Sequence, residues 1–303
     1  MSNQSQPQEE QAFILFAQHG WADTFHDIAQ LAKSLAYSNT IIYTPDLGWL
    51  NTWLEIAPLI SKVENIVTEA IAKHPELPWR IVAHSMGALI WLEVLDRHPE
   101  WLPKIHSFAL VASPVGGSDL GRLFDPFRWF PLMARDLGKN RRAIAEAIAS
   151  KIPTITVVGD LGNNTDGTVP VGCSQVARAT FVRLDGIRHA PLKNHPRVAI
   201  AVRQFWGNPV IATIQTDPAS QLIEKLRSLD LTETDNQNFA KAKLIYTGSD
   251  DTKLWVWTNA LQVMHVFVSV GDRCVYSAYT GWQNKGKLAM MLKKISQPAY
   301  WAD

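Results

Sequence analysis

A serine stands at an abrupt change of hydrophobic pattern. An apolar run, Trp79 to Ala83, predicts a buried strand that stops at His84, and a helical pattern begins directly after Ser85. The hydroxyl of Ser85 becomes a nucleophile only where a base takes its proton and N–H donors receive the developing oxyanion. The N–H of Met86 is one such donor, because the first N–H groups of a helix lack intrahelical partners and the helix dipole favours negative charge there.

The spacing around this serine is that of the nucleophile elbow G-x-S-x-G, with Ala83 in place of the first glycine and Gly87 as the second. On this motif and the elements around it, the chain resembles the α/β-hydrolase family over about residues 12 to 207. Within the family it resembles the small lipases, some of which carry alanine at the same position. The alternative interpretation is a chance turn of small residues before a helix.

The resemblance implies a second oxyanion donor. In the family, a His-Gly segment after the first strand contributes an N–H group. Here the run Ala12 to Ala17 predicts that strand, and His19-Gly20-Trp21 follows it closely. By resemblance, the donor is the N–H of Trp21. A simpler interpretation is that Gly20 only ends the strand and His19 packs beside it.

Two carboxylates compete for the role of the acid that orients a catalytic histidine. The predicted strand from Ile152 to Gly159 opens into a loop that holds both Asp160 and Asp166. In the family, the acid precedes a glycine, one variable residue and a valine. By resemblance this favours Asp166 and leaves Asp160 as a turn or helix-cap aspartate.

The base is also implied by the resemblance. The loop after the last predicted core strand, Ala179 to Leu184, holds His189, where the family keeps its histidine. His195 is the alternative, but it lies where the last helix begins, a position that suits a cap or a surface residue. The chain order serine, aspartate, histidine is the family order and differs from two other well-known triad orders.

Alternating strands and helices predict an α/β fold with a doubly wound, mostly parallel sheet of six strands and a site at their carboxyl ends. The apolar segment 47–53, which holds Trp49, is either core or a substrate wall. An insertion at about 116–151 lies where family members place a lid. Its Phe124, Phe127 and Trp129 are either the lining of an acyl pocket or an ordinary helical insertion packed on the core.

The sequence predicts a polar leader (1–11), a hydrolase-like domain (12–209) and a small α+β domain (210–303). The last contains a predicted helix, a four-stranded antiparallel meander and a final helix, and it resembles no family that we can name. Every candidate site residue precedes Phe205. A chain ending near Pro209 is therefore expected to keep hydrolysis of a small ester.

Composition excludes some classes of partner. The 303 residues contain 29 lysines and arginines against 28 aspartates and glutamates, a net charge of +1, so no nucleic-acid partner is expected. No signal peptide or spanning run is visible, which predicts a cytoplasmic protein with at most transient contact with a membrane surface. Cys173 and Cys274 are expected to be free thiols. The oligomeric state stays open.

The resemblance implies a serine hydrolase that cleaves a carboxylic ester of a small molecule or a lipid through an acyl-enzyme. This chemistry needs no cofactor and no metal. Two alternatives use the same residues or the same fold. One is an acyltransferase, in which an alcohol replaces water as acyl acceptor, and the other is a binding protein without turnover.

Overall fold

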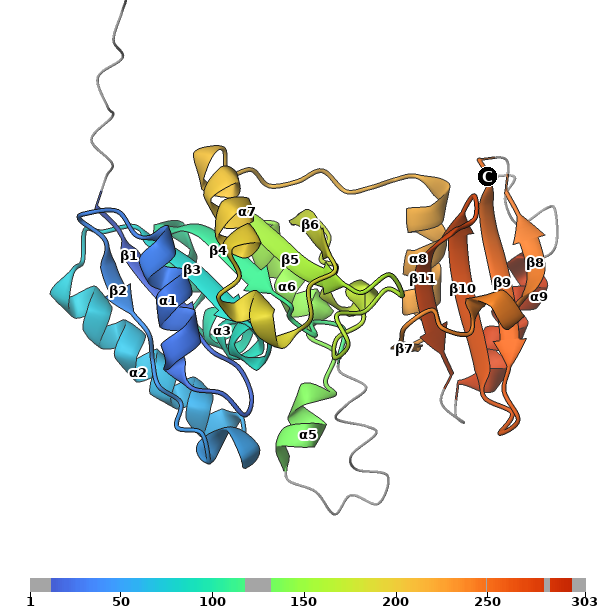
Figure 1. Ribbon diagram of the computed structural model, residues 1–303, viewed down its shortest axis with the longest axis horizontal. Coiled ribbons are helices and arrows are strands. Elements are labelled where there is room, and N and C mark those ends of the chain that lie inside the picture. Colours follow the sequence, from blue (N-terminus) through green and yellow to red (C-terminus); the bar gives the residue numbers. More distant parts are fainter. Residues whose placement is uncertain (1–11, 118–131, 249, 281–283, 296–303) are drawn as a thin grey trace, which may run out of the picture.

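The computed structural model describes residues 12–117, 132–248, 250–280 and 284–295. The predicted leader, 1–11, lies outside them. The described residues form two separate sheets, one in the first two thirds of the chain and one at its C-terminal end (Figure 1). None of the helices in these ranges combines the length and the apolar character that a bilayer-spanning segment needs.

The first sheet has six strands in the order β2-β1-β3-β4-β5-β6, and every neighbouring pair is parallel, which confirms the predicted core. The strands are β1 (Ile14–Gln18), β2 (Ile41–Tyr43), β3 (Trp79–His84), β4 (Ile105–Val111), β5 (Thr154–Asp160) and β6 (Thr180–Asp185). The chain moves outward from β1 to β2 and then returns to β3 on the other side of β1. The strand order therefore reverses between β1 and β3, where open α/β sheets place their sites.

Helices cover both faces of this sheet. They are α1 (Phe25–Leu35), α2 (Ala57–Lys73), α3 (Met86–Arg97), α5 (Leu132–Leu137), α6 (Arg142–Ala149) and α7 (Pro196–Gly207), with short 3₁₀ helices η1 (Asn51–Trp53), η2 (Pro99–Lys104), η3 (Val171–Ser174) and η4 (Ala190–Lys193). Side chains of α1 and α7 share one core cluster, and those of α2, α3 and α6 share the other. The result is three layers in which helices bury both faces of the sheet, and this explains the near-continuous apolar strands.

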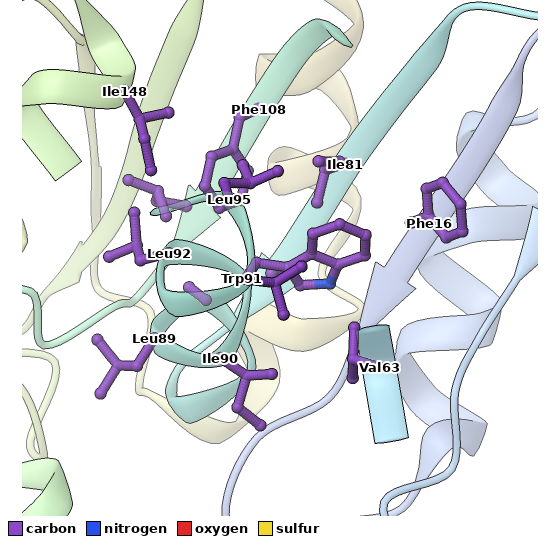
Figure 2. Packing of buried hydrophobic residues seen from close by; sticks show 14 of the residues in the cluster. Phe16, Val63, Ile81, Leu89, Ile90, Trp91, Leu92, Leu95, Phe108 and Ile148 are labelled. Carbon is purple, nitrogen blue, oxygen red and sulfur yellow. The ribbon is translucent and has the colours of Figure 1, made fainter. Parts of the chain in front are cut away.

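The helix α3 is buried almost all round, because it lies between the sheet and two other helices. Figure 2 shows Trp91 of α3 beside Ile81 and facing Phe16, whose ring centroid lies 5.2 Å away. Ile148 of α6 belongs to the same cluster as Leu92. The part of the predicted insertion that forms α6 therefore packs on the core, whereas residues 118–131 lie outside the described ranges.

The second sheet is antiparallel, in the order β7-β11-β10-β9-β8. Its strands are β7 (Thr232–Glu233), β8 (Lys243–Thr247), β9 (Thr252–Thr258), β10 (Met264–Val270) and β11 (Arg273–Tyr279), and η5 (Phe239–Lys241), α8 (Pro218–Arg227) and α9 (Lys285–Ile295) complete the domain. The predicted meander is β8 to β11. The fifth strand, β7, is missing from the prediction because two residues are too few for an alternating pattern. The apolar sides of α8 and α9 cover one face of this sheet.

Candidate active site

The elbow serine has a strained backbone. Ser85 joins β3 to α3 with φ 54° and ψ −125°, a region that residues other than glycine rarely occupy. Its N–H donates to the carbonyl of Val111 at the end of β4 (2.8 Å), and its own carbonyl accepts from the N–H of Ala88 (3.1 Å). Such a conformation costs about 1–3 kcal/mol and persists only where the surroundings hold it.

Two glycines let the elbow approach the end of β1. A Cβ on Gly87 would lie 2.4 Å from the carbonyl oxygen of His19, and a Cβ on Gly20 would lie 2.9 Å from Cβ of Ser85 and 3.3 Å from the backbone nitrogen of Met86. Neither glycine has room for a side chain. The close approach brings the loop after β1, which carries the N–H of Trp21, against the N-terminus of α3, which carries the N–H of Met86. These are the two predicted oxyanion donors.

Hydrogen bonds link the serine to a histidine and an aspartate. Oγ of Ser85 lies 3.0 Å from Nε2 of His189, and Nδ1 of His189 lies 2.7 Å from Oδ2 of Asp166. The three residues follow β3, β6 and β5, at the carboxyl ends of parallel strands. An acceptor carboxylate at Nδ1 favours the tautomer in which Nε2 faces the hydroxyl and can take its proton.

The aspartate is held from several sides. Oδ1 of Asp166 accepts the N–H groups of Thr168 (2.9 Å) and Val169 (2.7 Å), and its carbonyl accepts the N–H of His189 (3.0 Å). The side chain is only 2 % exposed, whereas that of His189 is 15 % exposed. With Oδ1 occupied by two donors, Oδ2 is aimed at the imidazole.

The two competing residues have other partners. The buried carboxylate of Asp160 accepts the N–H of Gly162 (2.8 Å) and forms an ion pair with Arg183. Nδ1 of His195 accepts the N–H of Arg197 (3.1 Å) and caps α7. Asp160 is therefore a turn aspartate and His195 a helix cap, as their alternative interpretations predict.

No family model and no curated protein matches the sequence. Solved structures do match. The mature lipase BlEst2 of Bacillus licheniformis has a TM-score of 0.50 at 15 % identity, over 66 % of this chain and 94 % of that one. Est1E of Butyrivibrio proteoclasticus, solved with ferulic acid, has a TM-score of 0.52 at 16 % identity, over 66 % and 90 %. The metagenomic carboxyl esterase MGS0156 has 0.50 at 15 %, over 67 % and 79 %.

This chain has the α/β-hydrolase fold. Identities of this size establish the fold alone, and the chemistry has to be argued from the residues of the site. The α/β-hydrolase core formed by the six-stranded sheet and its helices ends with α7, and the second sheet follows as a separate module.

A histidine without a predicted role supports the loop that carries His189 in this α/β-hydrolase core. His84, the last residue of β3, is buried and its Nε2 donates to the carbonyl of His189 (3.2 Å). Burial, together with the neighbouring His189, lowers the pKa of His84 well below its usual value, so the ring is neutral. Its position directly before the elbow serine is the signal that could have drawn attention to it.

A second histidine braces the proposed oxyanion loop. Nδ1 of His19 donates to the carbonyl of Gly20 (3.1 Å), and Nε2 accepts the N–H of Leu47 (3.0 Å). Because burial lowers the pKa of His19, the ring is neutral, and its 3.7 Å approach to Asp46 is no ion pair at neutral pH. This tautomer orients the Gly20–Trp21 peptide, whose N–H is the proposed donor.

The segment 47–53 also supports that loop. Oγ1 of Thr52 accepts the N–H of Ala22 (3.1 Å) and donates to the carbonyl of Trp49 (2.6 Å). The rings of Trp21 and Trp53 lie 4.4 Å apart, and those of Trp53 and Trp49 lie 5.6 Å apart. Trp49 is 48 % exposed whereas Leu47 is fully buried, so the segment is surface around Trp49 and core at Leu47.

Of the proposed substrate-lining residues, Phe124, Phe127 and Trp129 lie outside the described residues. A surface hollow of about 590 Å³ lies between η1 and α2, lined by Leu54, Leu59 and their neighbours, and its lining includes none of the three hydrogen-bonded residues. Within the described ranges, no group of three or more histidines, cysteines and acidic residues could hold a metal ion.

Proposed function

We propose that the chain is a serine hydrolase that cleaves carboxylic esters of small molecules or lipids. The observation that carries the proposal is the hydrogen-bond chain from Ser85 through His189 to Asp166, which has the donors and acceptors that acyl transfer needs. An ester is favoured over an amide because the structural neighbours include proteins named as a lipase and a carboxyl esterase.

In the proposed reaction, His189 Nε2 takes the proton of Ser85 as Oγ bonds to the ester carbonyl carbon. Asp166 accepts the Nδ1–H and stabilises the imidazolium. The N–H groups of Met86 and Trp21 receive the oxyanion. His189 then protonates the leaving alkoxide, which leaves an acyl-enzyme. Water attacks the acyl carbon while His189 takes its proton. His189 then returns this proton to Oγ of Ser85 as the second tetrahedral intermediate collapses, which releases the acid and restores Ser85.

The proposal is tested with a fluorophosphonate probe and a set of p-nitrophenyl esters of graded acyl length. The wild-type protein is expected to be labelled at Ser85 and to turn over at least one ester. Ser85→Ala removes both signals. Ser150→Ala, at the end of α6, is the matched control and keeps both. Unlabelled wild-type protein that is inert toward the whole ester set contradicts the proposal.

A further inference from the structure

The second domain contacts the α/β-hydrolase core at the loop that carries the acid. We propose that this domain positions the triad acid, with Asn164 and Glu233 as positioning residues, and that it is therefore part of the catalytic apparatus. The inference rests on the proposed function, because it assigns a role to residues that act through Asp166.

Asn164 joins the acid loop to the second sheet. Its Nδ2 donates to the carbonyl of Cys274 in β11 (2.9 Å), while its Oδ1 accepts from Arg183 (3.3 Å), the arginine paired with Asp160. The residue is buried and has φ +59°, a left-handed conformation that asparagine tolerates better than most residues. The amide nitrogen of Asn164 therefore binds the second domain, and its amide oxygen binds the hydrolase core.

A second contact fixes the neighbouring residue. The N–H of Asn236, between β7 and η5 of the second domain, donates to the carbonyl of Asn163 (3.1 Å). Two successive residues of the acid loop are thus bound to the second domain. They come directly before the narrow turn in which Thr165 pairs with Pro170.

Hydrogen bonds within this turn couple the position of Asn164 to that of the triad acid. The carbonyl of Asn164 accepts the N–H of Val171 (2.8 Å), and the N–H of Asp166 donates to the carbonyl of Val169 (3.2 Å). Because the same turn supplies the two N–H groups that bind Oδ1 of Asp166, a shift of its base moves the carboxylate. A displacement of about 1 Å in a catalytic group lowers turnover by about 100-fold.

A buried ion network fastens the other side of the loop. Oε1 of Glu233 in β7 lies 3.0 Å from a guanidinium nitrogen of Arg142 in α6 and 2.8 Å from Nε of Arg227 in α8. Both arginines also donate to the carbonyl of Gly172 in η3 (3.3 and 3.2 Å). A Cβ on Gly172 would lie 2.8 Å from Oε2 of Glu233, so a side chain at this position would displace the carboxylate.

The two arginines of the network keep Glu233 charged. Burial alone raises the pKa of Glu233, but the two guanidinium groups outweigh burial and lower it, so the carboxylate is charged. A buried carboxylate between two arginines is stable only while both are in place, because an unpaired buried charge is costly. The network therefore ties α6, η3 and the second domain into one arrangement beside the acid loop.

The test compares full-length variants. Asn164→Gly accepts the left-handed backbone and removes only the side-chain bonds, and Glu233→Gln removes the charge of the ion network beside the loop. Asp251→Gly is the matched control, because Asp251 also has a positive φ (+63°) but pairs with Lys253 in a hairpin turn. For each we measure kcat and KM with a soluble p-nitrophenyl ester, per active site titrated with a fluorophosphonate. Hydrogen exchange is measured over residues 160–170.

The expected result for Asn164→Gly is a fall in kcat of about 10- to 100-fold, with KM within about twofold of wild type and faster exchange at residues 165–169. Glu233→Gln changes the same quantities in the same direction, and Asp251→Gly changes none of them. A kcat per titrated site that stays at the wild-type value in both variants overturns the proposal. So does a loss of activity that only follows a loss of titratable sites.

The exchange data separate this inference from the proposed function. If wild-type protein neither reacts with the probe nor turns over any ester, the proposed function fails, and exchange of the acid loop still decides the positioning role. Faster exchange in Asn164→Gly and Glu233→Gln, but not in Asp251→Gly, then supports it. Unchanged exchange in both variants overturns it.

Discussion

The elbow and the acid loop are built in opposite ways. The residues that hold Ser85 belong to the central strands and to α3, and its N–H is bound by the adjacent strand β4. The loop of Asp166 stands between two domains, and two of its residues bind the second domain, whose sheet begins more than 60 residues later in the chain. The proposed nucleophile is thus placed by the core, whereas the proposed acid is placed partly by a separate module.

The elbow and the acid loop should respond differently to substitutions. A strained serine needs rigid surroundings, and the central core supplies them, with Trp91 and its neighbours fully buried. A loop held by a few polar contacts at a domain boundary can be loosened without unfolding the core. We therefore expect changes at the elbow to act on chemistry or on the whole fold, and changes that remove the contacts between the acid loop and the second domain to act on turnover more than on stability.

The largest expected effect is at the elbow itself. Ser85→Ala lowers kcat by about 10⁶-fold, because the nucleophile is lost, while the Tm stays close to that of wild type since the backbone contacts remain. Ester kinetics and thermal unfolding check this. A further variant, Ser85→Gly, is equally inactive but more stable than Ser85→Ala by about 1 kcal/mol, because glycine accepts the positive φ. Equal stability of the two variants contradicts the strain argument.

The next effect distinguishes the two aspartates of the acid loop. Asp166→Asn lowers kcat by about 10⁴-fold, because an amide favours the wrong histidine tautomer. Asp160→Asn changes kcat little but destabilises the fold by about 1–2 kcal/mol, because it removes the buried charge that pairs with Arg183, while Arg183 keeps Asp185 as a partner. Ester kinetics and denaturant unfolding of both variants measure the difference. The reverse ranking in kcat moves the triad acid to Asp160.

The sequence predicts the elbow side of the molecule well, and the reason is physical. The strand, the serine and α3 are neighbours in the chain, and the burial of β3 and α3 is visible as apolar runs. The six parallel strands follow from the same alternation. The hydrogen bonds among Ser85, Asp166 and His189 agree with the resemblance on which those residues were chosen, although their roles stay a proposal.

The contacts between the acid loop and the second domain could not be predicted, because the residues that make them are distant in sequence. Asn164 has nothing in its local pattern that points to Cys274, and Glu233 lies in a two-residue strand that no periodicity reveals. The sequence alone suggests that a chain ending near Pro209 keeps its activity. The contacts of Asn164 and Glu233 argue for the opposite, so a chain without the second domain is expected to lose turnover.

A smaller effect tests how tightly the elbow is packed. Gly87→Ala places a methyl group against the carbonyl oxygens of His19 and Gln18, which are backbone atoms and give way poorly. We expect a loss of about 1–3 kcal/mol in the free energy of unfolding, measured with denaturant. Gly207→Ala is the matched control, since its Cβ meets nothing within 4 Å at the end of α7, and it is not destabilising. A Gly87→Ala protein as stable as wild type contradicts the packing argument.

The smallest effect concerns His84 and pH. Its pKa is lowered well below 6.5 in the folded protein, so in acid the unfolded chain binds a proton that the folded protein does not. The free energy of unfolding therefore falls as the pH drops below about 6.5, by at most about 1.4 kcal/mol per pH unit from this group. His84→Gln removes that contribution and keeps an N–H for the carbonyl of His189. Denaturant unfolding between pH 7.5 and about pH 4.5 measures the slopes, and equal slopes for His84→Gln and wild type would show that His84 is not buried as a neutral ring.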